Sequence, residues 1–215
     1  MSNSKLIIIE GAQGAGKTTV TDYIRHSLKY TNLYRLCGIS DSTAEGKKKT
    51  ADMYIDLLEY MEKMENKNIN LLFDRTFFSE ENYCRLGKKD YSFTDVYEKL
   101  LERFSKLDFE IFYITLYLED EKQFEKRLDR EGKAVPDYAK FATENSIKQQ
   151  REYLNMANEI KEKYPNIKVI NLKNDRELEE VKKDLNEILD IWCLYMKIKE
   201  KPRLEEKKGE QVRIR

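Results

Sequence analysis

The chain has 215 residues, and its 40 lysines and arginines balance 40 aspartates and glutamates, so its formal net charge is zero. This length suits one sizeable domain, and the balanced charge argues against stable binding to nucleic acid. We find no segment that resembles a signal peptide or a membrane span. Three widely spaced cysteines (Cys37, Cys84 and Cys193) make no disulfide framework, and the single histidine, His26, excludes a zinc site. We therefore expect a cytoplasmic protein without a membrane partner.

The first predicted element is an apolar strand followed by a glycine-rich turn. Residues 6–9 form the continuous apolar run of a buried parallel strand. The next residues match the pattern G-x-x-x-x-G-K-[ST] of a P-loop, or Walker A motif. Its glycines let backbone N–H groups surround phosphate oxygens, its lysine reaches the β- and γ-phosphates, and its threonine hydroxyl binds Mg²⁺. The residues expected to bind ATP are Gly11, Ala12, Gln13, Gly14, Ala15, Gly16, Lys17, Thr18 and Thr19.

Helices and strands alternate along the rest of the chain. Apolar residues at three- and four-residue steps predict helices, and short β-branched or aromatic runs predict strands. The predicted helices span 19–30, 50–65, 93–106, 121–130, 144–164 and 178–196, with a helical turn over 79–85. The later strands are predicted at 33–37, 68–73, 109–118 and 168–172, and loops at 38–46 and 132–138.

This alternation predicts an α/β fold, because strands joined through helices pair in parallel by right-handed crossovers. We expect a three-layer P-loop NTPase fold with a five-stranded parallel sheet flanked by helices. The domain is predicted to span residues 1–196, with a lid at about 120–140. Residues 197–215 are rich in Lys, Glu and Arg and form a charged C-terminal tail.

Asp74 and Arg75 directly follow the predicted strand 68–73. Ligands of open α/β sheets bind beyond the carboxyl ends of the strands, where the P-loop is also expected. Arg75 suits bidentate binding of an acceptor phosphate, and Asp74 suits ordering of Mg²⁺ or removal of a proton from the acceptor. An ordinary ion pair or a helix cap is the structural alternative. We assign catalytic roles to Lys17, Asp74 and Arg75, and metal ligation to Thr18 and Asp74.

A second basic group lies in the predicted lid. Arg127 and Arg130 are three residues apart and share one face of the predicted helix, and Lys133 follows them. A lid of this kind closes over a nucleotide, excludes water and brings positive charge to the moving phosphoryl group. We therefore assign catalytic roles to both arginines. The alternative is a solvated charged face, since acidic residues are interleaved with the basic ones.

Three segments of the chain resemble the thymidylate kinases. Residues 9–19, Ile-Glu-Gly-Ala-Gln-Gly-Ala-Gly-Lys-Thr-Thr, resemble the P-loop of that family. Asp74–Arg75–Thr76–Phe77–Phe78–Ser79 with Tyr83 resembles its D-R-x-x-x-S…Y segment, and residues 127–133 are similar to its lid. The resemblance implies transfer of the ATP γ-phosphoryl group to a deoxynucleoside monophosphate, and a protein that is often a homodimer. By position it implies that Lys17 and Thr18 serve ATP–Mg²⁺ and that Arg75 holds the acceptor phosphate.

The acceptor side of the chain departs from that family. Gln13 stands where the family usually has a carboxylate, Cys84 stands where it has a glutamine, and residues 50–54 lack its arginine. The deoxynucleoside kinases share the broad layout but usually place a catalytic carboxylate after the second strand, where Asp41 is the candidate. The resemblance thus supports ATP as the donor more strongly than dTMP as the acceptor.

The leading hypothesis is an ATP- and Mg²⁺-dependent kinase of a small nucleoside or nucleotide. One alternative is a P-loop kinase of another small molecule or of a polynucleotide 5′ end, although a polynucleotide usually requires a basic groove. The other alternative is an ATPase or switch without a small acceptor. A GTPase would need an N-K-x-D segment, which Asn174–Asp175 does not supply.

Overall fold

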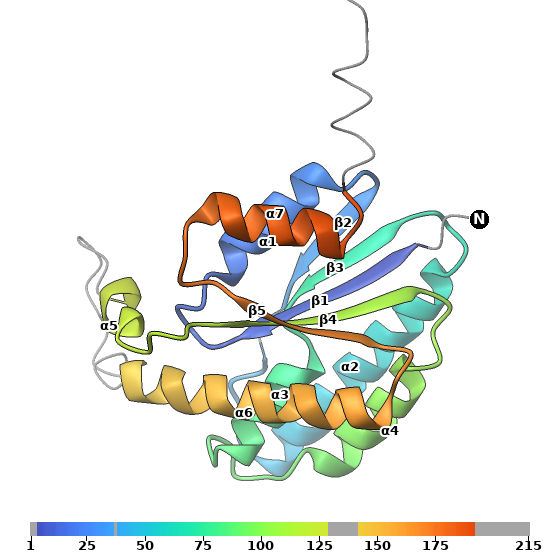
Figure 1. Ribbon diagram of the computed structural model, residues 1–215. Helices are drawn as coiled ribbons and strands as arrows, with labels where there is room; N and C mark the ends of the chain where they lie inside the picture. Colours follow the sequence, from blue (N-terminus) through green and yellow to red (C-terminus); the bar gives the residue numbers. More distant parts are fainter. Residues whose placement is uncertain (1–3, 37, 129–141, 192–215) are drawn as a thin grey trace, which may run out of the picture.

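The computed structural model describes residues 4–36, 38–128 and 142–191, which fold into alternating strands and helices (Figure 1). Arg130, Lys133 and the predicted tail at 197–215 lie outside the described residues. In chain order the elements are β1 Lys5–Gly11, α1 Lys17–Ser27, β2 Thr31–Arg35, α2 Ala44–Met64, β3 Asn70–Asp74, α3 Phe77–Arg85, α4 Thr94–Phe104, β4 Glu110–Tyr117, α5 Gln123–Leu128, α6 Ala142–Lys163, β5 Lys168–Lys173 and α7 Leu178–Ile188.

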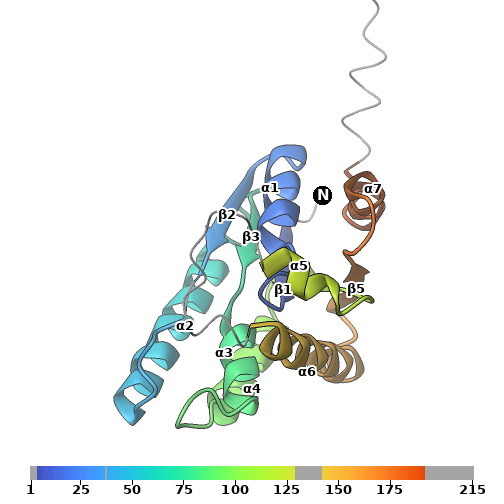
Figure 2. The same cartoon turned by 90° about the vertical axis from the view of Figure 1, so that its left-hand side faces the viewer.

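The five strands form one parallel sheet in the order β2-β3-β1-β4-β5, which confirms the predicted fold class. Strand β1 lies at the centre, where Leu6 to Ile9 are fully buried. Helices cover both faces of the sheet, with α1 and α7 on one side and α2, α3, α4 and α6 on the other (Figures 1 and 2). A strand covered on both faces must be apolar throughout, and this explains the unbroken aliphatic run.

Alternate side chains of β1 enter two separate cores. Leu6 and Ile8 belong to the core beneath the sheet, whereas Ile7 and Ile9 belong to the core under α1 and α7. The lower core is rich in aromatic rings, and Phe104 of α4 packs edge-on against Phe77 and Phe78 with ring centroids 5.9 and 5.8 Å away. This cluster attaches α3 and α4 to the underside of the sheet.

Two predicted helices differ most from the structure at one end. Helix α2 begins at Ala44 rather than at residue 50, because Thr43 caps it by accepting a hydrogen bond from the Gly46 N–H (3.3 Å). Part of the predicted loop 38–46 is therefore helical. Helix α7 ends at Ile188, before the predicted end at residue 196, and residues 192–196 lie outside the described part of the chain. Asp190 has a φ of +52°, a left-handed conformation that does not continue an α-helix.

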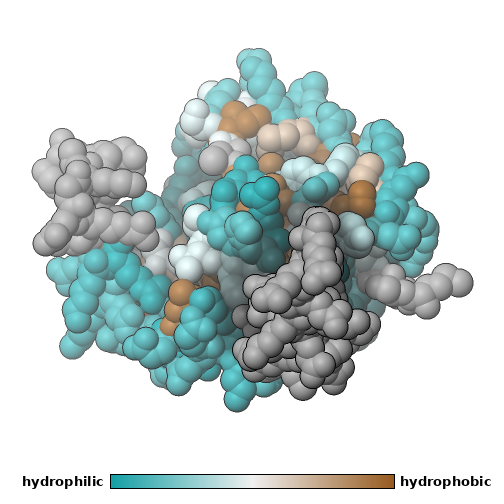
Figure 3. All heavy atoms as spheres, turned by 90° about the horizontal axis from the view of Figure 1, so that it is seen from above, coloured by the Kyte–Doolittle hydropathy of each residue, from teal (hydrophilic) through white to brown (hydrophobic). Residues whose placement is uncertain are grey.

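The surface above α1 and α7 is largely hydrophilic, with hydrophobic residues scattered among polar ones (Figure 3). His26 is exposed on α1, as its position in the helix predicts. Within the described part of the chain, no helix combines the length and the apolar character that crossing a bilayer requires.

Replacing Phe104 with alanine is predicted to lower the free energy of unfolding by about 3–5 kcal/mol, because this fully buried ring leaves a cavity in the lower core. Urea denaturation measures the change. The matched control is Tyr30→Ala, which truncates a 78% exposed ring and should change stability by less than about 0.5 kcal/mol. Equal losses in the two variants would contradict this account of the core.

Candidate functional site

The predicted P-loop connects β1 to α1 at the carboxyl edge of the sheet. Gly11 has a φ of +146°, and a Cβ there would stand 2.8 Å from the Leu116 carbonyl oxygen. Gly16 has a φ of +90°, and its Cβ would stand 2.3 Å from Nδ2 of Asn174. Both positions require glycine, because a side chain would be strained and would collide. The turn thus has the tight backbone that a phosphate-binding loop needs.

Lys17 lies at the start of α1, with its ammonium inside the loop. Its Nζ donates hydrogen bonds to the carbonyl oxygens of Gly11 and Ala12, both at 2.8 Å. Burial lowers the pKa of Lys17 to about 7, and the positive charge of Arg75 acts in the same direction. The neighbouring Thr18 is exposed on the first turn of the helix. The loop therefore holds a desolvated cation next to an accessible hydroxyl.

Asp74 and Arg75 lie at the same edge of the sheet as the P-loop. Asp74 pairs with Ile9 in the β1–β3 register, and the Arg75 N–H donates to the Ile9 carbonyl (3.2 Å). Arg75 has a φ of +74°, and its Nη1 donates to the hydroxyl of Tyr83 (3.0 Å). The buried Asp74 carboxylate lies 3.8 Å from Nε of Arg35. The structure thus brings the two predicted charged centres together, while their roles stay predictions.

Glu10 links these two centres, and sequence reasoning gave it no role. Its carboxylate is fully buried, with Oε1 accepting from the Thr76 N–H (2.8 Å) and Oε2 from the Ser79 hydroxyl (2.7 Å). The Ser79 hydroxyl also pairs with that of Tyr153 (2.8 Å). Burial raises the pKa of Glu10 to about 7. The sequence held one signal for these contacts: an acidic residue at the end of an apolar strand is expected to be buried, and a buried carboxylate requires hydrogen-bond partners.

Helix α5 lies against the P-loop through Arg127. The Nη2 of Arg127 donates to the Asn174 carbonyl (2.5 Å), and its Nη1 lies 3.5 Å from the Gly14 carbonyl. Asn174 in turn donates from Nδ2 to the Ala15 carbonyl (2.6 Å). Arg127 therefore lies beside the P-loop, where a residue of the predicted lid is expected. Asn174 was missed, because only the fold brings the end of β5 to this loop.

The acceptor-side departures also lie near the site. Gln13 is exposed in the P-loop, and its N–H donates to Oε1 of Gln149 on α6 (3.3 Å). Cys84 is half-buried on α3, and burial raises the pKa of its thiol to about 12, so it remains protonated at neutral pH. Gln13 lacks the negative charge of the carboxylate that the thymidylate kinases usually have at this position. Cys84 lacks the amide of their glutamine.

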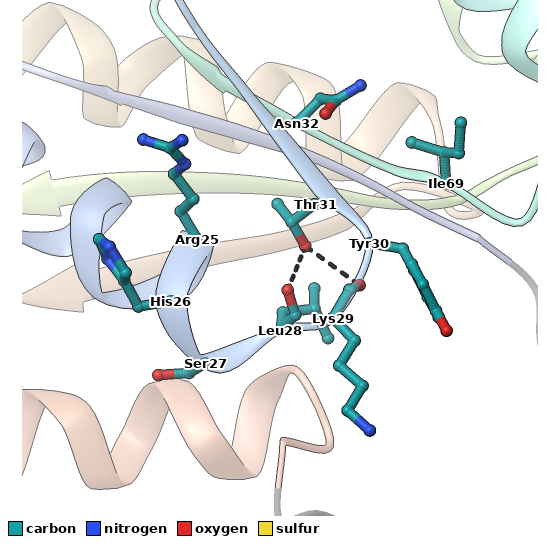
Figure 4. A pocket seen from close by; sticks show the side chains of 9 residues that line it. All are labelled: Arg25, His26, Ser27, Leu28, Lys29, Tyr30, Thr31, Asn32 and Ile69. Atoms are coloured by element: carbon teal, nitrogen blue, oxygen red, sulfur yellow. Dashed lines mark hydrogen bonds between the residues drawn. The ribbon is translucent and has the colours of Figure 1, made fainter.

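A pocket of about 330 Å³ opens beside Arg75. It is lined by Leu36, Gly38, Ile39, Tyr54, Arg75, Ser79, Glu80, Tyr83 and Lys89. A larger pocket of about 610 Å³ lies at the opposite, amino-terminal edge of β2 (Figure 4). Arg25 and His26 extend to one side and Lys29 and Tyr30 to the other, so these side chains do not converge on a common point. Of these two pockets, the one beside Arg75 adjoins the P-loop edge, so we take it as part of the site.

The oxygens predicted to bind a divalent cation are those of Thr18 and Asp74. The described residues include no group of three His, Cys, Asp or Glu side chains that would hold a metal. Mg²⁺ needs few protein ligands, because it keeps waters and takes phosphate oxygens in kinase sites. A hydroxyl and a carboxylate at one edge of the sheet fit this requirement.

Glu10 is predicted to make stability depend on pH. Its pKa is 4.5 in the unfolded chain and about 7 in the folded one, so the folded protein keeps a proton that the unfolded chain releases. The free energy of unfolding should therefore fall as pH rises between these values. Relative to the parent protein, Glu10→Gln should gain on the order of 1–3 kcal/mol across this window.

Urea denaturation at several pH values tests this prediction. Exposed Glu98 supplies the control variant Glu98→Gln, which should follow the parent protein throughout. A stability difference between Glu10→Gln and the parent that does not change with pH would show that Glu10 does not titrate in this window.

No protein-family model matches the sequence, and no curated protein matches it. Solved structures do resemble the fold. Thymidylate kinase from Candida albicans shares 17% identity over 87% of this chain and 92% of that chain, with a TM-score of 0.60. Deoxyadenosine kinase from M. mycoides, with dCMP and dCDP bound, shares 18% identity over 86% and 98%, with a TM-score of 0.54. The YorR protein from Bacillus subtilis, in complex with phosphorylated GDP, shares 17% identity over 86% and 96%, with a TM-score of 0.59. The chain therefore has the P-loop fold of the nucleotide and nucleoside kinases, as the resemblance in its sequence predicts.

Proposed function

We propose that this protein is an ATP-dependent kinase that phosphorylates a nucleoside or a nucleoside monophosphate. One observation carries the proposal: Lys17 in a P-loop and Arg75 beside a pocket lie at the same edge of the sheet. A phosphoryl group can be transferred only between ligands held close together and in line. Two cationic centres at one edge, with a pocket beside the second, fit a donor and an acceptor.

The P-loop is suited to bind the donor phosphates. Its backbone N–H groups and the start of α1 favour anions. Lys17 now donates to the loop carbonyls of Gly11 and Ala12, so nucleotide binding requires its ammonium to exchange these bonds for phosphate oxygens. Mg²⁺, when bound, neutralises developing charge on the phosphates, and Thr18 and Asp74 would hold it. Arg127, which already lies at the loop, adds positive charge on the donor side.

Arg75 is suited to bind the acceptor. Tyr83 accepts from Nη1, which fixes the guanidinium at the pocket wall. A fixed, planar guanidinium binds phosphate oxygens bidentately. Asp74 precedes it and lies near enough to Lys17 to influence the pKa of that residue. This position suits either support of Mg²⁺ or removal of the acceptor's proton.

The solved structures support a nucleotide-type acceptor, since those proteins are named for thymidylate and deoxyadenosine or hold phosphorylated GDP. Sparse cysteines and a balanced net charge agree with a cytoplasmic protein that does not bind nucleic acid stably. We also propose a homodimer, and this part rests only on the resemblance of the sequence to the thymidylate kinases.

Lys17→Ala is predicted to lower kcat by about 10²–10³-fold, because the transferring phosphoryl group loses a preorganised cation. ADP formation with Mg²⁺, ATP and a panel of nucleosides and monophosphates provides the measurement. The control is Lys63→Ala, which removes an exposed lysine of α2 and should keep full activity. If the parent protein forms no more ADP with any acceptor than without one, it is not a kinase of this class.

Arg75→Ala is predicted to raise the KM for the acceptor by about 10–100-fold, because a charge-assisted contact worth about 1.5–3 kcal/mol is lost. The dissociation constant for ATP should change little. Acceptor-dependent kinetics and ATP titration of the same preparation separate the two effects. Unchanged acceptor kinetics would remove Arg75 from the acceptor site.

A further inference from the structure

We propose that Lys89 is a positioning residue for the acceptor: its ammonium holds residues 38–41 in place as one wall of the pocket beside Arg75. Lys89 acts on the acceptor through this wall and takes no part in the transfer of the phosphoryl group. The inference rests on the proposed function, because it concerns the binding of the acceptor in that same pocket.

One wall of the pocket is a segment without regular secondary structure. Leu36, Gly38 and Ile39 line the pocket and belong to the connection between β2 and α2. The Leu36 N–H donates to the Asp74 carbonyl (3.1 Å), which extends the pairing of β2 with β3 by one residue. Residues 38–41 make no main-chain hydrogen bond to any other part of the chain that the structure describes. This part of the wall therefore depends on side chains to hold it.

Lys89 reaches this segment from the connection between α3 and α4. Its Nζ donates to the carbonyl oxygens of Ile39 (2.5 Å) and Asp41 (3.4 Å) and lies 3.4 Å from Oε1 of Glu80 on α3. An ammonium has three N–H donors, so these oxygens account for all of them. The side chain is only 10% exposed, so water has little access to replace these partners. Lys89 thus ties the wall segment to the first turn of α3.

Other side chains contact the same segment, but at its exposed end. The Ser42 hydroxyl donates to Oδ2 of Asp90 (2.8 Å), and the Thr43 N–H donates to Oδ1 of Asp41 (2.8 Å). Both hydrogen bonds are exposed, so each exchanges readily with bonds to water and contributes little to the placement of the segment. The bonds of Lys89 are partly buried and reach Ile39, which itself lines the pocket. We therefore assign the placement of the wall to Lys89.

A wall that is fixed before the ligand arrives increases affinity, because the ligand does not have to order it. Fixing the backbone of a single residue costs a factor of about 5–30 in a binding constant at 25 °C. Loss of the bonds from Lys89 releases Ile39 and its neighbours, so the acceptor should bind about 10–100-fold more weakly. None of the residues that line the pocket belongs to the P-loop, so the affinity for ATP should change little.

Calorimetric titration of Lys89→Met with the four common deoxynucleosides and their monophosphates tests the inference. For the panel member that the parent protein binds most tightly, the dissociation constant should rise by about 10–100-fold, while that of ATP changes by less than about threefold. In ADP formation the loss should appear in the KM for the acceptor, with kcat within about twofold of the parent value. General destabilisation would instead reduce the folded fraction and so lower kcat at unchanged KM. Equal acceptor dissociation constants in variant and parent would overturn the inference.

Two single variants serve as rescue and control. Lys89→Arg keeps a cation with several N–H donors at this position, so it should bind the acceptor more tightly than Lys89→Met does. Lys99→Met removes an exposed lysine of α4 and should bind the acceptor as the parent protein does. Equal weakening in Lys89→Met and Lys99→Met, or no recovery in Lys89→Arg, would contradict a role for the ammonium of Lys89.

A further pair of variants guards against a folding artefact. Lys89→Met leaves the buried carboxylate of Glu80 without its cation, and such a loss can prevent folding. In Glu80→Gln the ammonium keeps both carbonyl oxygens, whereas Lys89→Met/Glu80→Gln lacks both charges and leaves the wall untied. Circular dichroism and thermal unfolding show which variants are folded. If Lys89→Met does not fold, this pair decides: the double variant should bind the acceptor about tenfold or more weakly than Glu80→Gln, and equal binding would overturn the inference.

ADP formation by the parent protein with the same panel separates this inference from the proposed function. Weaker binding to Lys89→Met, without ADP formation by the parent protein, would remove the kinase proposal and leave the role of Lys89 in ligand binding. ADP formation with equal KM values in variant and parent would leave the kinase proposal and remove the role of Lys89. Absence of binding to the parent protein by every member of the panel would overturn both.

Discussion

The buried carboxylate of Glu10 holds together the two halves of the candidate site. It projects from the end of β1, directly before the P-loop, and accepts hydrogen bonds from Thr76 and Ser79, which follow Arg75. Arg75 has a left-handed backbone conformation, which is unfavourable for a residue with a long side chain. These bonds, together with the pairing of Ile9 and Asp74, keep that turn in place. The placement of the guanidinium thus depends on an acid that lies on a different strand.

Charge is concentrated at this edge of the sheet. Lys17 and Arg75 are both cations, and the proximity of Arg75 is one cause of the lowered pKa of Lys17. Glu10 is close enough to both for their charges to oppose its raised pKa. An anion held between Lys17 and Arg75 would relieve the repulsion between these two cations, as the carboxylates of Asp74 and Glu10 do in part.

Features set by neighbouring residues could be predicted from the sequence. The fold followed from the alternation of strands and helices, beginning with the aliphatic run before Gly11. The edge of the sheet that carries the candidate site followed from the glycines of the turn and from Asp74 after a buried strand. The predicted start of α2 was wrong, because the cap at Thr43 extends the helix into a segment whose composition is typical of a loop. Glu10 and Asn174 were missed, although both contact the predicted site. Their contacts join residues far apart in the chain, and no window of sequence contains such contacts.

The P-loop and the pocket beside Arg75 are supported by different elements of the fold. The P-loop is supported by α1 and by Asn174 after β5, whereas the pocket beside Arg75 is built from α3, Tyr54 of α2 and the segment after β2. The two sets of supports meet at Glu10, which accepts hydrogen bonds from Thr76 and Ser79. A substitution at Tyr54 therefore changes the wall of the pocket and leaves the hydrogen bond between Asn174 and the glycine-rich turn in place.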